Sequence, residues 1–224
     1  MLELGLKTLI AYLLGAVLGS LVMGRLRGVD IRELGSGNAG GTNALRTQGW
    51  GFALGVVLIV AYTSWITRSP YACLVAPGLG FGPLMVVGTH VAVAGHYDTA
   101  AGIAALVPFF LVSALLLLNQ FPDVEADREA GRRHLPIAWG RPRAARAFVT
   151  LYALAYLSLV AGVVAGALPW PCLLGLVTLT LAIPAARDVL RHPDDVKALL
   201  PAMGRNVMVN LATPAFVAVG LFVG

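Results

Sequence analysis

The sequence predicts an all-α protein that crosses a membrane several times, a polytopic transmembrane bundle of about seven helices. Of its 224 residues, 58% are hydrophobic and 12% are charged, and the mean hydropathy is +0.81. Composition excludes an ordinary soluble domain, in which about a quarter of the residues are charged. The net charge of +5 comes mainly from arginines gathered in a few loops. Such loops suit the cytoplasmic face of a lipid bilayer and phosphate groups, so we expect no nucleic-acid partner.

The expected helices follow from apolar windows of roughly 18 to 25 residues, the length that spans a bilayer. These windows lie at about 7–24, 50–67, 72–94, 100–119, 144–166, 168–187 and 207–223. We expect the first to be an uncleaved span, because it runs directly into Arg25 and Arg27 without a clear signal-peptidase site. Cys73 and Cys172 lie alone in separate windows, which predicts packing residues and neither a disulfide nor a metal pair.

The arginines also predict the sidedness of the loops. Loops 120–143 and 188–206 hold most of them and fall on one side if the spans alternate, as does the short turn 67–71. We expect this side to be the cytoplasmic face of the plasma (inner) membrane. Loop 25–49 is also rich in arginine but falls on the opposite side. Either a helix is miscounted, or the two ends of the chain do not share one topology.

Acids and arginines crowd the segment "NQFPDVEADREAGRR" at 119–133, directly after an apolar window. Asn119, Asp123 and Asp127 recur every four residues, so a helix that continues past the membrane boundary stacks them along one face. Mg²⁺ is usually bound through one or two carboxylates and substrate phosphates, which makes these three residues candidate magnesium ligands.

Three arginines of the same segment are candidate phosphate contacts. Arg128, Arg132 and Arg133 carry guanidinium groups, whose geometry and charge match phosphate oxygens. The simpler alternative is a solvated helix end, in which Glu125 pairs with Arg128 and Glu129 with Arg132 or Arg133.

The longer run "NQFPDVEADREAGRRHLPIAWG" resembles the second aspartate-rich motif of the UbiA-type membrane prenyltransferases, N-x-x-x-D-x-x-x-D followed by A-G-K/R-R. "AYTSW", "GLGFGPLMVVG" and "GRNVMVNLATPAFVAVGL" resemble further parts of that family, so the resemblance covers roughly residues 60–224. It implies a bundle that moves an isoprenyl group from its diphosphate to a lipophilic or aromatic acceptor with the help of Mg²⁺.

The resemblance also implies roles for particular residues. Asn119, Asp123 and Asp127 are the expected metal ligands, with the two aspartates carrying catalysis. Arg132 and Arg133 are expected to contact the diphosphate, and Arg68 is a further candidate contact. The family's first aspartate-rich motif has no counterpart before residue 60, so only half of the metal site is expected. An inactive protein therefore remains an alternative.

A second loop, "GVDIRELGSGNAGGTNALRTQG" at 28–49, is rich in glycine and hydroxyl groups. Its backbone N–H groups can approach an anion closely, with an arginine completing the charge. The candidate binding residues are Ser36, Asn38, Thr42, Asn43 and Arg46. A flexible interhelical turn is the alternative, and a Walker loop is excluded because the G-K-[ST] ending is lacking.

This loop resembles the first active-site motif of the PlsY-type acyl-phosphate:glycerol-3-phosphate acyltransferases, and "TLIAYLLGAVLGS" resembles the first helix of that family. The resemblance implies that the loop binds glycerol phosphate or acyl phosphate, although the family's later Gly-Gly-Lys-Gly loop and final His/Asn motif are absent. We therefore expect a fused chain, acyltransferase-like over 1–59 and prenyltransferase-like over 60–224, with a junction near Val60.

Prenyl transfer is the main function predicted from these patterns. The alternatives are acyl transfer to glycerol 3-phosphate, a step of phospholipid biosynthesis, and a non-catalytic lipid-binding membrane protein.

Overall fold

The computed structural model describes residues 65–224. The chain divides into two compact units, Met1–Trp65 and Ile66–Gly224, and the fold is that of the second unit. The expected helix at 7–24 and most of the one at 50–67 lie outside the described residues. So do the loop residues Ser36, Asn38, Thr42, Asn43 and Arg46. The junction near Val60 stays a prediction.

The described residues form helices and connecting turns, with no strand among them, and this confirms the all-α prediction. In chain order the elements are η3 (Ile66–Arg68), α5 (Pro70–Leu79), η4 (Gly80–Val87), α6 (Gly88–Ala94), α7 (Thr99–Ala104), α8 (Leu106–Asn119), α9 (Val124–Glu129), α10 (Leu135–Trp139), α11 (Arg141–Val164), η5 (Trp170–Thr178), α12 (Leu179–Arg191) and α13 (Val196–Val223).

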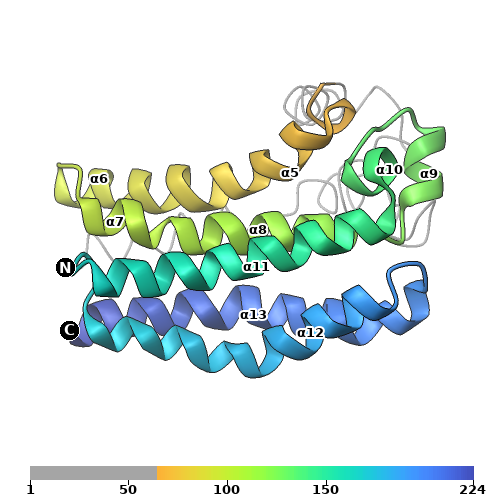
Figure 1. The fold of residues 1–224 in the computed structure, drawn as a ribbon. Helices are drawn as coiled ribbons and strands as arrows, with labels where there is room; N and C mark the ends of the chain where they lie inside the picture. The colour runs from red at the N-terminus through yellow and green to blue at the C-terminus, as the bar shows by residue number, and fades with distance from the viewer. Residues whose placement is uncertain (1–64) are drawn as a thin grey trace, which may run out of the picture. The chain divides into compact units, whose positions relative to one another are not determined.

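Five stretches of the described part are long and apolar enough to cross a membrane. They are Pro70–Ala94, Thr99–Asn119, Arg141–Val164, Trp170–Arg191 and Val196–Val223. They confirm a multi-pass helical bundle, with long helices running back and forth beside one another (Figure 1). The last span begins well before the predicted residue 207. Asp195 caps it, since its Oδ1 atom accepts a hydrogen bond from the Ala198 N–H at 3.1 Å.

The first described span contains two internal prolines and packs closely through glycine. Ser69 caps its start, where its hydroxyl oxygen accepts a hydrogen bond from the Ala72 N–H at 3.3 Å. Pro83 lies in the π-helical stretch η4, where its missing N–H and bulky ring disturb regular α-helical bonding. A Cβ atom on Gly78 would lie 2.4 Å from the Phe109 carbonyl oxygen, so only glycine permits this close packing of α5 on α8.

The hairpin order of the helices brings the charged loops to one end. The turn before α5, the α8–α11 connection with α9 and α10, and the α12–α13 turn all lie at the same end of the bundle (Figure 1). Every lysine and arginine between Trp65 and Gly224 lies within about three helical turns of that end. We call it the arginine-rich end. The prediction that 67–71, 120–143 and 188–206 share a side is confirmed for these residues.

The interior of the bundle is apolar with one polar layer. Leu111, Leu117, Phe148 and Leu159 are fully buried members of the core. Both cysteines are buried, as expected of packing residues. The polar layer contains the Tyr152 hydroxyl, which donates a hydrogen bond to Asn206 Oδ1 at 2.8 Å. This bond joins α11 to α13 in the buried interior, where Tyr152 is 4% and Asn206 0% exposed.

Candidate functional site

The connection between α8 and α9 breaks the predicted stack of Asn119, Asp123 and Asp127. The helix α8 ends at Asn119, and α9 begins only at Val124. Between them the chain tightens, with the Phe121 N–H bonded to the Leu118 carbonyl at 3.1 Å, and Pro122 supplies no N–H to continue the helix. The expectation of one continuous helical face is therefore wrong.

A glycine turn after α9 folds Arg132 back over Asp127. Gly131 adopts a positive φ of 73°, which favours glycine. The Arg132 N–H bonds to the Asp127 carbonyl at 2.9 Å, and the Gly131 N–H bonds to the Arg128 carbonyl at 3.0 Å. This pair of bonds is a Schellman motif, so the sequence A-G-R directly sets the position of the arginine.

Asp127, Arg132 and His134 form a compact ionic group that we call the Asp127 cluster. Arg132 Nη1 donates to Asp127 Oδ1 at 2.8 Å, and His134 Nε2 lies 3.2 Å from Asp127 Oδ2. The side chains are 16%, 6% and 1% exposed for Arg132, Asp127 and His134 respectively. Burial raises the pKa of the Asp127 carboxyl, but His134 and Arg132 outweigh it, and the net pKa is lowered. The carboxylate is therefore held ionised.

The other residues predicted for the site are mostly exposed. Asn119 ends α8 and Asp123 precedes α9, both with exposed side chains. Arg128 pairs with Glu125 at 2.5 Å on the surface, which confirms the simple surface pair for these two residues. Arg132 pairs with Asp127, so the suggested pair with Glu129 is wrong for Arg132.

Arg68 and Arg133 come from distant parts of the sequence but lie on adjoining segments. The Arg133 N–H donates to the carbonyl oxygen of Thr67, the neighbour of Arg68, at 2.8 Å. Both arginine side chains are exposed. The structure thus brings the two predicted phosphate contacts to the same end of the bundle.

Two contacts around the Asp127 cluster were not predicted from the sequence. His134 has no spacing that relates it to Asp127, and the only signal was its place in the family-like run after A-G-R-R. Arg141 donates through Nε and Nη2 to the Phe121 carbonyl oxygen at 3.2 and 3.1 Å. This arginine ties the start of α11 to the end of α8 and so closes the loop that carries the Asp127 cluster.

The three predicted magnesium ligands do not fit a metal site in this arrangement. Both carboxylate oxygens of Asp127 already face Arg132 or His134. Within residues 65–224, no group of three or more His, Cys, Asp and Glu is placed to hold a metal ion. Magnesium binding stays a prediction, and we derive no chemical step through the ion.

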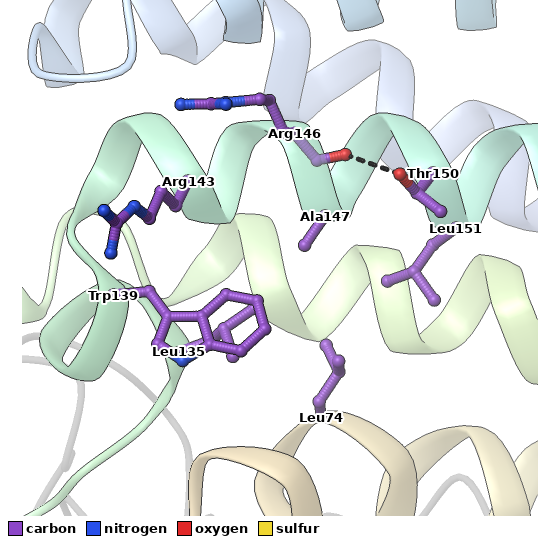
Figure 2. A pocket seen from close by; sticks show the side chains of 8 residues that line it. All are labelled: Leu74, Leu135, Trp139, Arg143, Arg146, Ala147, Thr150 and Leu151. Carbon is purple, nitrogen blue, oxygen red and sulfur yellow. Dashed lines mark hydrogen bonds between the residues drawn. The ribbon is translucent and has the colours of Figure 1, made fainter.

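A pocket of about 450 Å³ lies between α5, α10 and α11 (Figure 2). We call it the Arg143 pocket. Its lining residues are Leu74, Leu135, Trp139, Arg143, Arg146, Ala147, Thr150 and Leu151. The wall from α11 is one helical stripe with spacings of three and four residues. Gly140, at φ 79° and ψ 154°, turns the chain between α10 and α11 so that both helices line the pocket.

These features define a multi-pass membrane protein whose charged groups are concentrated at one end. The chain belongs to the UbiA prenyltransferase family, whose model matches residues 39–207. That match begins ahead of the junction predicted near Val60. No solved structure matches the chain.

Curated relatives carry a different activity in their names. A glycerol-3-phosphate acyltransferase of Chlorobaculum parvum is 44% identical over 98 residues, which cover 40% of this chain and 42% of the relative. One of Thermus thermophilus is 43% identical over 89 residues, covering 39% and 42%. One of Chlorobium chlorochromatii is 33% identical over 144 residues, covering 54% and 60%. The chain thus spans less than half the length of the first two relatives.

These relatives overturn prenyl transfer as the main function. The prediction rested on the aspartate-rich motif, and the relatives are named for acyl transfer to glycerol 3-phosphate. Family membership does not decide the reaction, because the family match is compatible with either activity.

Proposed function

We propose that this chain is a membrane-embedded transferase that acylates glycerol 3-phosphate with an acyl phosphate as donor. The observation that carries the proposal is the similarity to glycerol-3-phosphate acyltransferases at 43–44% identity over about two fifths of the chain. The product is a single-chain lipid phosphate, which belongs to the first steps of phospholipid synthesis.

The reaction transfers one acyl group and releases phosphate. A hydroxyl oxygen of glycerol 3-phosphate attacks the acyl carbonyl carbon, and an ester bond forms. The bond between that carbon and the phosphate oxygen breaks, so inorganic phosphate leaves and takes up the hydroxyl proton. Both substrates are phosphorylated, so the site must attract phosphate and stabilise negative charge that develops on the carbonyl oxygen.

The binding residues follow from the resemblance of the glycine-rich loop. Ser36, Asn38, Thr42, Asn43 and Arg46 are proposed to hold glycerol 3-phosphate or the phosphate of the donor, through the loop backbone and the arginine. The exposed guanidinium groups of Arg68, Arg128 and Arg133 support the proposal as attractors of phosphorylated substrates.

We propose that the arginine-rich end faces the cytoplasm of the plasma (inner) membrane. The distribution of lysine and arginine supports this orientation, since residues 65–224 carry them only near that end. Water-soluble glycerol 3-phosphate would then reach the protein from the cytoplasm, while the acyl chain comes from the bilayer.

The test is an acyl-transfer assay with the full-length protein in lipid vesicles. Formation of the single-chain lipid phosphate from radiolabelled glycerol 3-phosphate and acyl phosphate is expected. Arg46→Ala should reduce kcat/KM for glycerol 3-phosphate by about 100-fold, because a charge-assisted hydrogen bond to phosphate is lost. Arg27→Ala removes the same charge outside the loop motif and should change kcat/KM by less than about twofold. Absence of product from the wild-type protein would refute the proposed reaction.

A non-catalytic lipid-binding role is the second candidate. It is favoured by one observation, that both motif sets are incomplete in the sequence, which lacks the first aspartate-rich motif before residue 60 and the Gly-Gly-Lys-Gly loop. Retained binding of glycerol 3-phosphate, measured by calorimetry, together with no turnover would select this role.

A further inference from the structure

We propose that the Arg143 pocket binds one anionic phospholipid of the surrounding bilayer, with its phosphate at Arg143 and Arg146 and one acyl chain along the apolar wall. The proposal does not depend on the proposed acyl transfer. Among residues 65–224, no member of the Asp127 cluster lines the pocket.

The positive charge of the pocket has no counterpart in the described protein. Within residues 65–224, neither Arg143 nor Arg146 has an ion-pair partner, whereas Arg128, Arg132 and Arg205 each have a carboxylate. None of the lining residues is acidic, and α5 and α10 carry no charged residue. Both guanidinium groups extend toward the start of α11, where a lipid phosphate can accept from them (Figure 2).

The remaining wall suits hydrocarbon. Leu74 of α5 faces Ala147 and Leu151 of α11 across the pocket, and Leu135 of α10 lines it together with Trp139 (Figure 2). The one hydroxyl group, that of Thr150, donates to the Arg146 carbonyl at 3.0 Å and is already satisfied. The pocket therefore has a charged mouth and an apolar wall, the two parts of a phospholipid with one chain inserted.

The depth of the pocket matches the headgroup region. Arg143 lies in the first turn of the span Arg141–Val164. Trp139 lines the mouth, is 40% exposed, and packs edge-on against Tyr71 with ring centroids 5.9 Å apart. Tryptophan and tyrosine collect at the membrane–water interface, and basic pockets between helices on the cytoplasmic side bind anionic headgroups.

Trp139 supplies a direct reporter of the bound lipid. A variant with Trp50, Trp65 and Trp170 replaced by phenylalanine keeps only Trp139 and is placed in mixed phosphatidylglycerol and phosphatidylcholine vesicles. Brominated acyl chains, which quench tryptophan, are put on one lipid at a time at equal mole fraction. We expect quenching by brominated phosphatidylglycerol to correspond to a local enrichment of roughly fivefold or more over its mole fraction.

Two arginine variants decide whether the pocket causes the enrichment. Arg143→Gln with Arg146→Gln should reduce it to about onefold, which is the mole fraction itself. Arg187→Gln with Arg191→Gln removes the same charge from exposed residues of α12 outside the pocket and should leave the enrichment within about twofold. Equal loss in both variants would mean general surface attraction and would overturn the proposal.

A second reporter at the other end of the bundle completes the test. A protein that keeps only Trp170, which is 77% exposed at the start of η5, should show no enrichment of phosphatidylglycerol. Equal quenching of Trp139 by both brominated lipids, with helical content unchanged by circular dichroism, would also overturn the proposal. Acyl-transfer activity is measured separately, so failure of this site and failure of the proposed function are distinguishable.

Discussion

The two ends of the bundle are stabilised by different interactions. The arginine-rich end holds the Asp127 cluster, the bond from Arg141 to the Phe121 carbonyl, and the ion pair between Arg205 and Asp188 at 2.6 Å. The opposite end is almost uncharged. Within residues 65–224, Asp98 is the only Asp, Glu, Lys or Arg that lies there.

Close helix packing replaces charge at that opposite end. A Cβ atom on Gly220 of α13 would lie 2.4 Å from Cys172 Cα, and one on Gly162 of α11 would lie 2.6 Å from a methyl carbon of Ile103. Helices in lipid gain little from the hydrophobic effect between themselves, so small residues that permit close contact stabilise them. The comparison shows that charged groups and their hydrogen bonds stabilise one end, while close packing of small residues stabilises the other.

The largest expected loss of stability comes from a substitution at the arginine-rich end. Asp127→Asn removes the charge that balances Arg132 and the carboxylate that faces His134, in a group no more than 16% exposed. We expect the free energy of unfolding to fall by about 3 kcal/mol, because a buried partner is left uncompensated. Unfolding in mixed detergent and sodium dodecyl sulfate, followed by circular dichroism, measures the change.

The matched control is Glu125→Gln, at another carboxylate of the same short helix. Its ion pair with Arg128 has side chains 68% and 55% exposed, so the loss should be about 0.5 kcal/mol or less. Equal losses for the two variants would show that burial does not distinguish them.

At the opposite end, adding a single methyl group should lower the free energy of unfolding. Gly220→Ala places a carbon against the Cys172 and Pro171 backbone, and we expect a loss of about 2 kcal/mol from overpacking. Gly204→Ala, in the same helix, meets no atom within 4 Å and should leave stability unchanged or slightly raised. The same unfolding titration applies, and a neutral Gly220→Ala would contradict packing by shape at this end.

The membrane spans could be predicted from the sequence because hydropathy is a local property. The windows at 72–94, 100–119, 144–166 and 168–187 lie within a few residues of the observed spans. The start of the last span could not be found from hydropathy, because its first turns carry Lys197 and Arg205. The cap at Asp195 was the better signal.

The site was harder to predict because it depends on turns and on distant segments. Spacing of four residues predicted a stack of Asn119, Asp123 and Asp127, but Pro122 and the turn before α9 break it. Gly131 and its Schellman motif decide what Asp127 contacts. The Arg143 pocket needs Leu74 on α5 beside α11, a contact set by tertiary packing that no local pattern contains.

Acid should weaken the charged end selectively. The pKa of Asp127 is lowered from its ordinary value of 3.8 in the folded protein, so the folded state favours the ionised carboxylate. This contribution is fully present above the unfolded pKa and is lost as pH falls through the lower folded pKa. We expect the free energy of unfolding to fall more steeply below about pH 4 in the wild type than in Asp127→Asn, which lacks the titrating group. Parallel pH profiles of the two proteins would contradict this assignment.

The smallest expected effect lies between the two ends. Asn206 is ten residues into α13, about 15 Å along its axis, and its amide oxygen accepts from Tyr152 at 2.8 Å. Tyr152→Phe should lower the free energy of unfolding by about 0.6 kcal/mol, the usual value for a hydrogen bond between membrane helices. Tyr71→Phe, at a tyrosine 61% exposed on α5, is the control and should have no measurable effect. A loss for Tyr152→Phe as large as that for Asp127→Asn would mean that the strongest polar contact lies in the interior of the bundle. The contrast between the two ends would then not explain how the bundle is stabilised.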